Sequence, residues 1–256
     1  MSPVVDVSHL VKRYKKSPQN SVDNITFQVA KGEFFSLLGP NGAGKTTTIS
    51  ILTTTLSKTS GRALVAGFNI DTQAHDVRQH IGIIFQNPSL DQNLTSEENL
   101  RFHAALYHLY PYRPFFALMP DSYKRRVKEL TDVLRLTSAD LAKPVKTLSG
   151  GMKRKFEIVR SLLHRPEILF LDEPTAGLDP QARQNLWDYL NSIRRLNGTT
   201  IFLTTHYLEE AEDSDTVCIL KNGKIVAQGS PAAIKKVFAG RHTTLEQAYL
   251  KIIQDE

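Results

Sequence analysis

Short apolar runs recur along the chain and predict an α/β fold. Continuous apolar runs of about 4–8 residues are typical of strands that are buried on both faces. The chain has such runs at Phe34–Leu38, Ile81–Phe85, Ile168–Leu171, Thr200–Leu203 and Val217–Leu220. Further strands are predicted at Val4–Val11, Ile25–Val29, Gly61–Ala66 and Lys224–Ala227. The dipeptide Asn222-Gly223 favours a type I′ turn and predicts a tight hairpin between the strands on either side of it.

Helical spacing of apolar residues follows several of these strands. Ile49, Leu52 and Leu56 predict a helix after Phe34–Leu38, and further helices are predicted after Ser149 and after Pro180. Near the end of the chain, Thr243–Ile253 is predicted to be an amphipathic helix. Its inward residues are Leu245, Ala248, Tyr249 and Ile252.

Segment 94–145 is predicted to be a helical insertion in the α/β pattern. Its residues at helical spacing are Leu100, Ala104, Leu106, Val127, Leu130 and Leu134. Prolines between Pro111 and Pro120 predict a loop in the middle of the insertion, because proline cannot continue a helix.

This loop is unusually apolar, and two interpretations of it stay open. Loops lie at the surface as a rule, yet this one contains Phe115, Phe116, Leu118 and Met119. Either these side chains fold back onto the insertion, or they form an exposed patch for a partner.

The predicted organisation is a single domain over residues 1–256. Its α/β core comprises residues 1–93 and 146–229, interrupted by the helical insertion at 94–145 and followed by C-terminal helices at 230–256. A chain of 256 residues is long enough for an ample core.

Composition places the chain among ordinary globular proteins. No apolar run approaches the roughly 18–20 residues that cross a bilayer, and the first residues lack the layout of a secretory signal. The single cysteine, Cys218, lies in an apolar run and is interpreted as a core residue. These features predict a cytosolic protein.

The chain is basic, with a net charge of +6 and a pI of about 9.3. Its short basic runs, Lys12–Lys16, Lys124–Lys128 and Lys153–Lys155, are interpreted as solvated faces. Attraction to an anionic membrane surface is a second interpretation. No nucleic-acid partner is expected, because no recognised binding module accompanies the charge.

One segment carries the strongest chemical signal in the sequence. A buried-strand pattern runs into a glycine-rich loop, and a helix follows, which is the layout that holds the phosphates of a nucleotide. Backbone N–H groups of such a loop surround the anion, Lys45 reaches the β- and γ-phosphates, and the Thr46 hydroxyl ligates Mg²⁺. The predicted nucleotide-binding residues are Gly39, Pro40, Asn41, Gly42, Ala43, Gly44, Lys45, Thr46 and Thr47.

Two carboxylates follow the predicted strand Ile168–Leu171. Asp172 lies where a nucleotide's Mg²⁺ must be held, and Glu173 is placed to polarise the attacking water as general base. A second helix N-terminus of the anion-binding kind is predicted at Ser149, Gly150 and Gly151, because two glycines in a first helical turn otherwise only cost stability.

The order of these motifs resembles that of ATP-binding-cassette (ABC) ATPases over nearly the whole chain. The matching segments are Gly39–Thr47, Leu148–Met152, Asp172–Glu173, Gly177-Leu178-Asp179 and His206. The resemblance implies a P-loop NTPase core with an N-terminal antiparallel β subdomain and an inserted α-helical subdomain, and ATP with Mg²⁺ as its ligands.

The resemblance also assigns roles to residues outside the P-loop. Tyr14 is expected to stack on the adenine, and Asp179 to couple two active sites. Gln86 is expected to sense Mg²⁺ and the attacking water, and His206 to contact the γ-phosphate.

Family members act in pairs, which implies the partners of this chain. Two chains meet head to tail, so that Ser149 and Gly151 of one close over ATP on the P-loop of the other. The second chain is either another copy or a paralogue, and separate integral membrane subunits form the translocation pathway. The implied location is the cytoplasmic face of the cell membrane.

Local features favour one branch of the family. Ser-Gly-Gly-Met at Ser149–Met152 and the segment Thr205–Glu212 resemble drug-resistance and polysaccharide exporters. The alternative is a non-transport cassette that acts on ribosomes or DNA. A plain P-loop kinase or GTPase is disfavoured by the helix that starts at Ser149.

Overall fold

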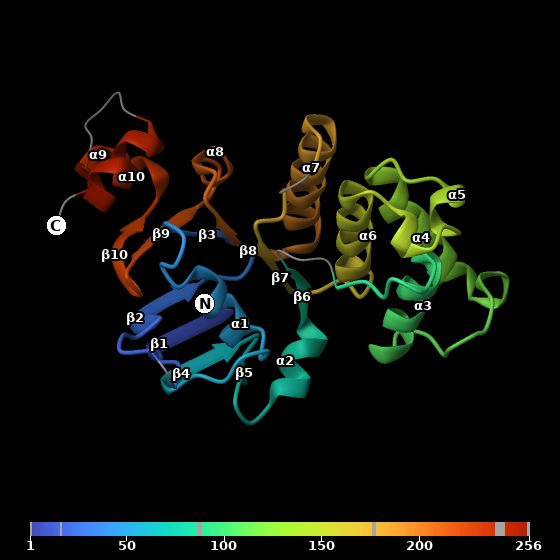
Figure 1. Cartoon of the computed structure of the whole chain (residues 1–256), viewed down its shortest axis with the longest axis horizontal. Coiled ribbons are helices and arrows are strands. Elements are labelled where there is room, and N and C mark those ends of the chain that lie inside the picture. Colours follow the sequence, from blue (N-terminus) through green and yellow to red (C-terminus); the bar gives the residue numbers. More distant parts are fainter. Residues whose placement is uncertain (1, 16, 86–88, 176–177, 239–243, 255–256) are drawn as a thin grey trace.

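The computed structural model describes residues 2–15, 17–85, 89–175, 178–238 and 244–254, which form two sheets and several groups of helices (Figure 1). The larger sheet has the strand order β10-β9-β3-β8-β7-β6. All neighbours from β9 to β6 are parallel, and β10 pairs with β9 antiparallel. The strands are β3 (Phe34–Leu38), β6 (Ile81–Ile84), β7 (Ile168–Asp172), β8 (Thr200–Thr205), β9 (Thr216–Lys221) and β10 (Lys224–Gly229).

The smaller sheet is antiparallel, with the order β2-β1-β4-β5. Its strands are β1 (Val5–Lys12), β2 (Val22–Val29), β4 (Ser60–Val65) and β5 (Phe68–Asn69). Along β2 the buried residues alternate with more exposed ones, so one face of the strand is apolar and must be covered.

Aromatic rings join the two sheets. Phe27 of β2 stacks on Phe35 of β3 with 5.3 Å between ring centroids. Phe202 of β8 lies 5.0 Å from Phe35 and 5.2 Å from Phe170 of β7. All four rings are buried, so the apolar face of the small sheet is covered by the large one.

Helices pack on both faces of the large sheet. They are α1 (Lys45–Leu52), α2 (Ala74–His80), α6 (Gly150–Leu162), α7 (Pro180–Asn197) and α8 (Leu208–Ala211). Helices α1 and α2 lie in the cluster that holds the small sheet, and α6 and α7 lie in another cluster. The last helices, α9 (Pro231–Phe238) and α10 (Leu245–Gln254), lie at the end of the molecule opposite to the helical insertion (Figure 1). Within the described ranges, every helix is too short or too polar to span a bilayer.

The helical insertion forms as predicted. It contains α3 (Ser96–Leu106), α4 (Asp121–Val133) and α5 (Ser138–Leu141), with short 3-10 turns at Phe116–Leu118 and Val145–Thr147. Five of the six residues predicted from helical spacing are buried, and Leu106 is 73% exposed. The buried ones pack into the same cluster as α6 and α7, so the insertion shares a core with the α/β part.

Each interpretation of the apolar loop between α3 and α4 holds for part of its side chains. Met119 is buried, and Phe116 packs edge-on against Tyr123 of α4 with 6.0 Å between ring centroids. Phe115 and Leu118 are 66% and 58% exposed. The buried Arg101 of α3 holds the loop in place by donating to the carbonyl oxygens of Arg113 and Pro114. The loop therefore has a packed side and an apolar outer side.

Other predictions can be compared with the structure directly. The hairpin turn is confirmed, since Asn222 and Gly223 both have positive φ (49° and 78°) as a type I′ turn requires. The core position of Cys218 is confirmed as well, and burial raises the pKa of its thiol to about 12. Helix α2 was not predicted. The numerical division into core, insertion and C-terminal helices stays a prediction.

The interpretation of Lys153–Lys155 as a solvated face is wrong for Arg154. Arg154 is only 3% exposed. It lies on the face of α6 that packs against the large sheet, where backbone carbonyl groups accept its hydrogen bonds. Local charge pattern could not show these acceptors, because they come from segments distant in the sequence.

We expect Phe116→Ser and Phe115→Ser to affect stability differently. Phe116→Ser removes a ring packed on Tyr123 and should cost about 2 kcal/mol, which corresponds to about 4–8 °C in melting temperature. Phe115→Ser is the matched control, because it makes the same change on an exposed side chain. Thermal melts of both variants measure the difference. Equal melting temperatures would show that Phe116 contributes no packing.

Candidate nucleotide site

The glycine-rich loop joins β3 to α1, and its backbone conformation requires glycine. Gly42 and Gly44 have φ of 82° and 106°, values that residues with a Cβ rarely adopt. A Cβ on Gly44 would also collide with the carbonyl oxygen of Ser21. Helix α1 begins at Lys45, directly after this turn, so its N-terminal N–H groups face the loop.

Lys45 lies across the loop rather than in solvent. It is 6% exposed, and its Nζ donates to the carbonyl oxygens of Gly39 (2.6 Å) and Pro40 (3.2 Å). Burial lowers the pKa of the Lys45 ammonium, and the carboxylates of Glu173 and Asp172 raise it. Lys45 is therefore a buried ammonium at the loop that the sequence predicts to bind phosphates.

A cavity of about 240 Å³ brings the loop together with the end of β7. Its lining comes from the loop, the start of α1 and one residue of each of two distant segments. The lining residues are Ser21, Asn41, Gly42, Gly44, Lys45, Thr46, Thr47 and Glu173. Glu173 therefore shares one cavity with the loop that sequence motifs predicted to bind phosphates.

Asp172, the last residue of β7, is held by two threonines. Thr46 Oγ1 lies 3.4 Å from Asp172 Oδ1, and the Thr204 hydroxyl donates to the same oxygen. Asp172 is almost fully buried. A hydroxyl and a carboxylate are the oxygen ligands that Mg²⁺ takes beside substrate phosphates, so the donor set of Thr46 and Asp172 fits this ion.

Glu173 is paired with His206. The Nδ1 atom of His206 lies 2.9 Å from Glu173 Oε1, which places the candidate general base and the candidate γ-phosphate contact side by side. Glu173 has φ of 50°, an uncommon conformation for a residue with a side chain. Such conformations cost free energy and persist only where surrounding contacts fix them.

The other predicted site residues lie outside this cavity. The Tyr14 ring is 43% exposed, with Lys12 Nζ 5.3 Å from its centroid. Ser149 caps α6 by accepting from the Met152 N–H, and Gly150 begins that helix. Asp179 caps α7 through the Ala182 N–H. Gln86 and Gly177 lie outside the described residues.

None of residues 149–151, all of which are described, lines the cavity beside the P-loop. That these residues serve the nucleotide of a second chain stays a prediction. Within the single chain, the cavity is lined mainly by the P-loop, the start of α1 and Glu173 after β7.

Sequence reasoning missed two residues next to the site. Arg154 and Glu157 of α6 form a buried ion pair, with 3.0 Å between Arg154 NH1 and Glu157 Oε2. The signal for Glu157 was a charged residue inside the apolar run Phe156–Val159. The signal for Arg154 was the opposite charge of Glu157, three residues later on the same helix face.

Comparison with known families decides the identity. The family described as ABC transporter matches residues 22–176, which is more than half of the chain. The chain belongs to this family.

Relatives place this ABC cassette among export-type proteins. It is 40% identical over 231 residues to the Nod factor export ATP-binding protein I of Ralstonia nicotianae, and the match covers 90% of the chain and 68% of that protein. It is 36% identical over 255 residues to the probable multidrug ABC transporter ATP-binding protein YbhF of Escherichia coli, covering 98% of the chain and 42% of YbhF.

Solved structures of ABC ATPases share the fold. An ATP-binding subunit of an ABC transporter superposes with a TM-score of 0.86 at 32% identity, covering 97% of this chain and 99% of that one. A dimeric cassette in a post-hydrolysis state, bound to ADP and Pi, superposes with a TM-score of 0.78 at 25% identity, covering 88% and 98%. The P-loop NTPase fold, the export branch and the assignment as an ATPase are thereby confirmed.

Lys45→Ala should weaken nucleotide binding itself. On the predicted role of Lys45, the variant would lose a charge-assisted hydrogen bond to the phosphates worth about 1.5–3 kcal/mol, or roughly 10- to 100-fold in Kd. Titration calorimetry with ATP measures the change. Lys236→Ala, which removes an exposed lysine of α9, is the control. Unchanged ATP affinity in Lys45→Ala would show that this side chain does not face the phosphates.

Proposed function

We propose that this ABC cassette hydrolyses ATP at the cavity between the P-loop and β7, with roles that follow the site geometry. The P-loop N–H groups and Lys45 bind the phosphates, and Thr46 and Asp172 hold Mg²⁺. Bound Mg²⁺ would supply charge neutralisation at the β- and γ-phosphates. The observation that carries the proposal is the single cavity lined by Lys45, Thr46 and Glu173.

Glu173 is the general base of this proposal. Its carboxylate borders the cavity, where it can accept the proton of the attacking water. His206, 2.9 Å from the Glu173 carboxylate, orients it and contacts the γ-phosphate. Tyr14 stacks on the adenine, because its exposed ring beside the N-terminal sheet is available to a base.

The complete site needs a second cassette. Helix α6 begins with a serine cap, Ser149, followed by two glycines, Gly150 and Gly151. Because glycine has no side chain, an anion bound to another chain could approach the backbone N–H groups of this helix start closely. Since these residues do not line the chain's own cavity, we assign them to the nucleotide of a second copy or a paralogue. Asp179, at the start of α7, couples the two sites.

Glu173→Gln should block hydrolysis while leaving ATP affinity intact. A positioned base contributes about 10²–10⁴-fold, so turnover should fall by that factor. With ATP retained, size-exclusion chromatography should show a dimer for Glu173→Gln and mainly monomer for the wild type.

Glu209→Gln is the matched control for this experiment. It makes the same chemical change on an exposed glutamate outside the cavity, and turnover should stay at the wild-type rate. Wild-type turnover in Glu173→Gln itself would eliminate Glu173 as the base.

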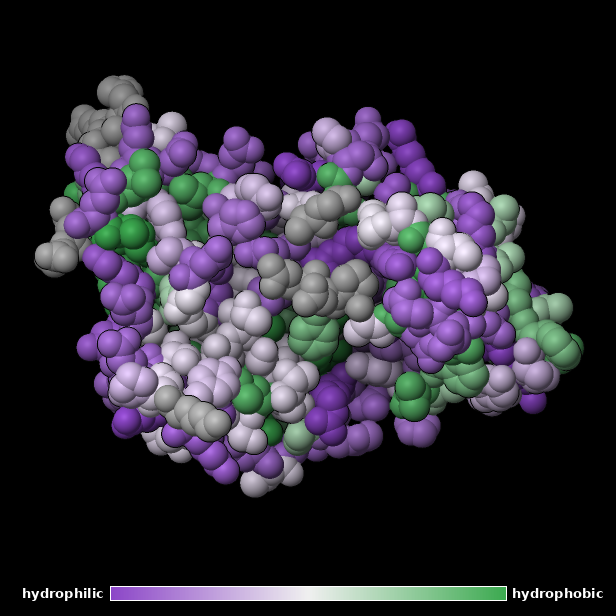
Figure 2. All heavy atoms as spheres, viewed as in Figure 1, coloured by the Kyte–Doolittle hydropathy of each residue, from purple (hydrophilic) through white to green (hydrophobic). Residues whose placement is uncertain are grey.

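The partners we propose are integral membrane subunits, reached from the cytoplasmic face of the membrane. A surface on the insertion suits such a partner. Figure 2 shows apolar atoms, in green, at the right-hand end of the molecule, where α3 and the loop after it lie in Figure 1. Exposed apolar residues in this region are Phe102, Leu106, Tyr112, Phe115 and Leu118, which we call the insertion patch.

The insertion patch is held in place before any partner binds. Phe102 stacks on Tyr112 with 5.3 Å between ring centroids, and Arg101 fixes the loop carbonyl groups of Arg113 and Pro114. An ordered apolar surface loses little conformational entropy when it is covered. The alternative partners, ribosomes or DNA, are not favoured by the export-type relatives.

Phe115→Ser combined with Leu118→Ser tests the membrane partner. Both side chains are exposed, so the melting temperature and the basal ATPase rate should not change. Recovery of a multi-span membrane protein with the tagged chain from solubilised membranes should be lost. Leu196→Ser, on an exposed leucine of α7, is the control and should retain that recovery. Retention by the double variant would remove the insertion patch from the interface.

A further inference from the structure

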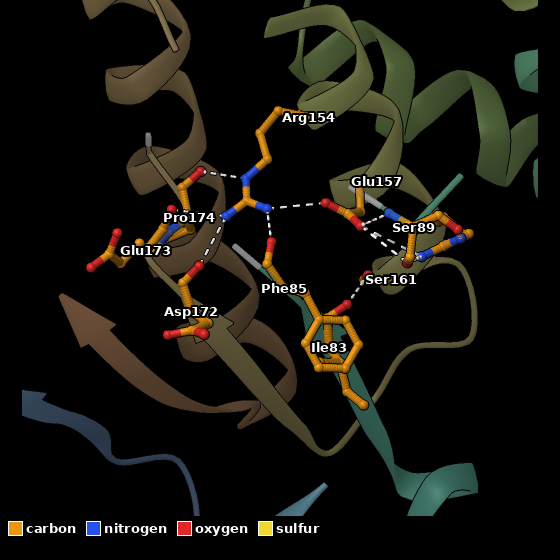
Figure 3. Close-up of polar contacts among 10 residues, drawn as sticks. Ile83, Phe85, Ser89, Arg154, Glu157, Ser161, Asp172, Glu173 and Pro174 are labelled. Atoms are coloured by element: carbon orange, nitrogen blue, oxygen red, sulfur yellow. Dashed lines mark hydrogen bonds and ion pairs between the residues drawn. The ribbon is translucent and has the colours of Figure 1, made fainter. Parts of the chain in front are cut away.

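A buried guanidinium contacts the backbone of the candidate metal ligand Asp172 and of the candidate general base Glu173. Arg154 of α6 uses every N–H it has, as Figure 3 shows. Nε donates to the Pro174 carbonyl oxygen (2.9 Å), and NH2 donates to those of Asp172 (3.1 Å) and Glu173 (2.8 Å). NH1 donates to the Phe85 carbonyl oxygen and to Glu157 Oε2.

Three of these acceptors belong to consecutive residues at the end of β7. The middle one is Glu173, whose φ of 50° needs surrounding contacts to persist. The Glu173 N–H is held from the other side by the carbonyl oxygen of Thr204 (2.9 Å). Arg154 and β8 therefore fix the peptide groups on both sides of the Glu173 Cα atom.

Glu157 fixes the guanidinium and reaches a second segment. Its Oε2 accepts from Arg154, while its Oε1 accepts from the backbone N–H (2.8 Å) and the hydroxyl (3.2 Å) of Ser89. Arg160, one turn further along α6, donates to the Ser89 carbonyl oxygen (2.9 Å). Side chains on one face of α6 thus form hydrogen bonds both with Ser89, after β6, and with the backbone at the end of β7.

Helix α6 itself is seated firmly on β6. A Cβ on Gly82 would lie 2.6 Å from the Ser161 carbonyl oxygen, and the Ser161 hydroxyl donates to the carbonyl oxygen of Ile83 (2.5 Å). Because any shift of α6 along β6 would break these contacts, the guanidinium group of Arg154 is held at a fixed position. The same helix begins at Ser149.

We propose that the Arg154–Glu157 pair positions the Glu173 carboxylate for hydrolysis by clamping the backbone of β7's end onto α6. The inference rests on the proposed function, in which Glu173 is the general base. Arg154 touches neither substrate nor metal and acts only through the backbone it holds. Bidentate and multi-carbonyl contacts need the planar fork of arginine, which a lysine ammonium cannot replace.

Arg154→Lys is the principal test, because it keeps the positive charge and removes the fork. Turnover should fall about 10²-fold, the usual effect of a small misplacement of a reacting group. ATP affinity should not change, since Lys45 and the P-loop are untouched. Both quantities are measured on folded protein well below the melting temperature of the variant.

Arg194→Lys is the matched control. Arg194 also binds one backbone carbonyl oxygen, that of Gly32, and one carboxylate, that of Asp215, but at a distance from the site. It should lose stability and keep its turnover. Wild-type turnover in folded Arg154→Lys would overturn the proposal and leave the pair a stability element.

Glu157→Gln provides a second variant should Arg154→Lys not fold. It keeps an acceptor for Ser89 and removes the charge that orients the guanidinium, so turnover should again fall with ATP affinity unchanged. Turnover should not fall further when Glu157→Gln is added to Arg154→Lys, because two residues that act as a unit are non-additive. Wild-type turnover in Glu157→Gln would contradict the proposal. So would a double variant whose loss of turnover equals the product of the losses in the two single variants.

Glu173→Gln separates this inference from the function on which it rests. Arg154→Lys should cause no further loss in a Glu173→Gln background if both act on the same step. Should Glu173→Gln itself turn over normally, the base assignment fails. Should Glu173→Gln be inactive while Arg154→Lys is fully active, only the positioning role fails.

Discussion

The arrangement around the nucleotide site depends on the burial of one cation. Removing a guanidinium from water costs several kcal/mol unless its charge and N–H groups are compensated. Arg154 is compensated by one carboxylate and four carbonyl oxygens, drawn from α6, the end of β6 and the end of β7. These acceptors must converge for the fold to be stable, and their convergence fixes three segments relative to one another. Asp172, the candidate metal ligand, and Glu173, the candidate general base, lie in one of those segments.

The charges of Lys45, Asp172 and Glu173 determine which ligand suits the cavity beside the P-loop. Burial lowers the pKa of Lys45, and the nearby carboxylates of Glu173 and Asp172 oppose part of that shift. A bare phosphate chain entering this cavity would be attracted by Lys45 and by the N-terminus of α1 but repelled by the acids. On the proposed function, a divalent cation held by Thr46 and Asp172 would remove that repulsion. The charges around the cavity would then favour a nucleotide with its metal over an anion alone.

Much of this was predictable from local sequence, and the exceptions have a common cause. The strands around Phe35, Phe170 and Phe202 follow from apolar runs, and the P-loop follows from glycines whose conformations a Cβ would forbid. Arg154 was misinterpreted, because whether a basic residue is solvated depends on carbonyl groups that only tertiary structure supplies. The loop at Phe115 and Phe116 was undecided for the same reason: neighbouring phenylalanines of equal hydrophobicity face opposite ways, one onto Tyr123 and one outward.

The position of Arg154 on α6 links the two halves of a paired site. On the proposed function, the first residues of α6 bind the nucleotide of the partner cassette, while Arg154 in the second turn holds the base for the chain's own nucleotide. Both groups lie within the first two turns of one helix, whose seat on β6 fixes their positions relative to each other. On the proposed function, the contact of Ser149 with the partner's nucleotide and the contact of Arg154 with the Glu173 backbone would therefore share one rigid element. Each chain would hydrolyse its own ATP in a geometry set partly by the ATP of the other, which is a physical reason for the cassettes to act as a pair.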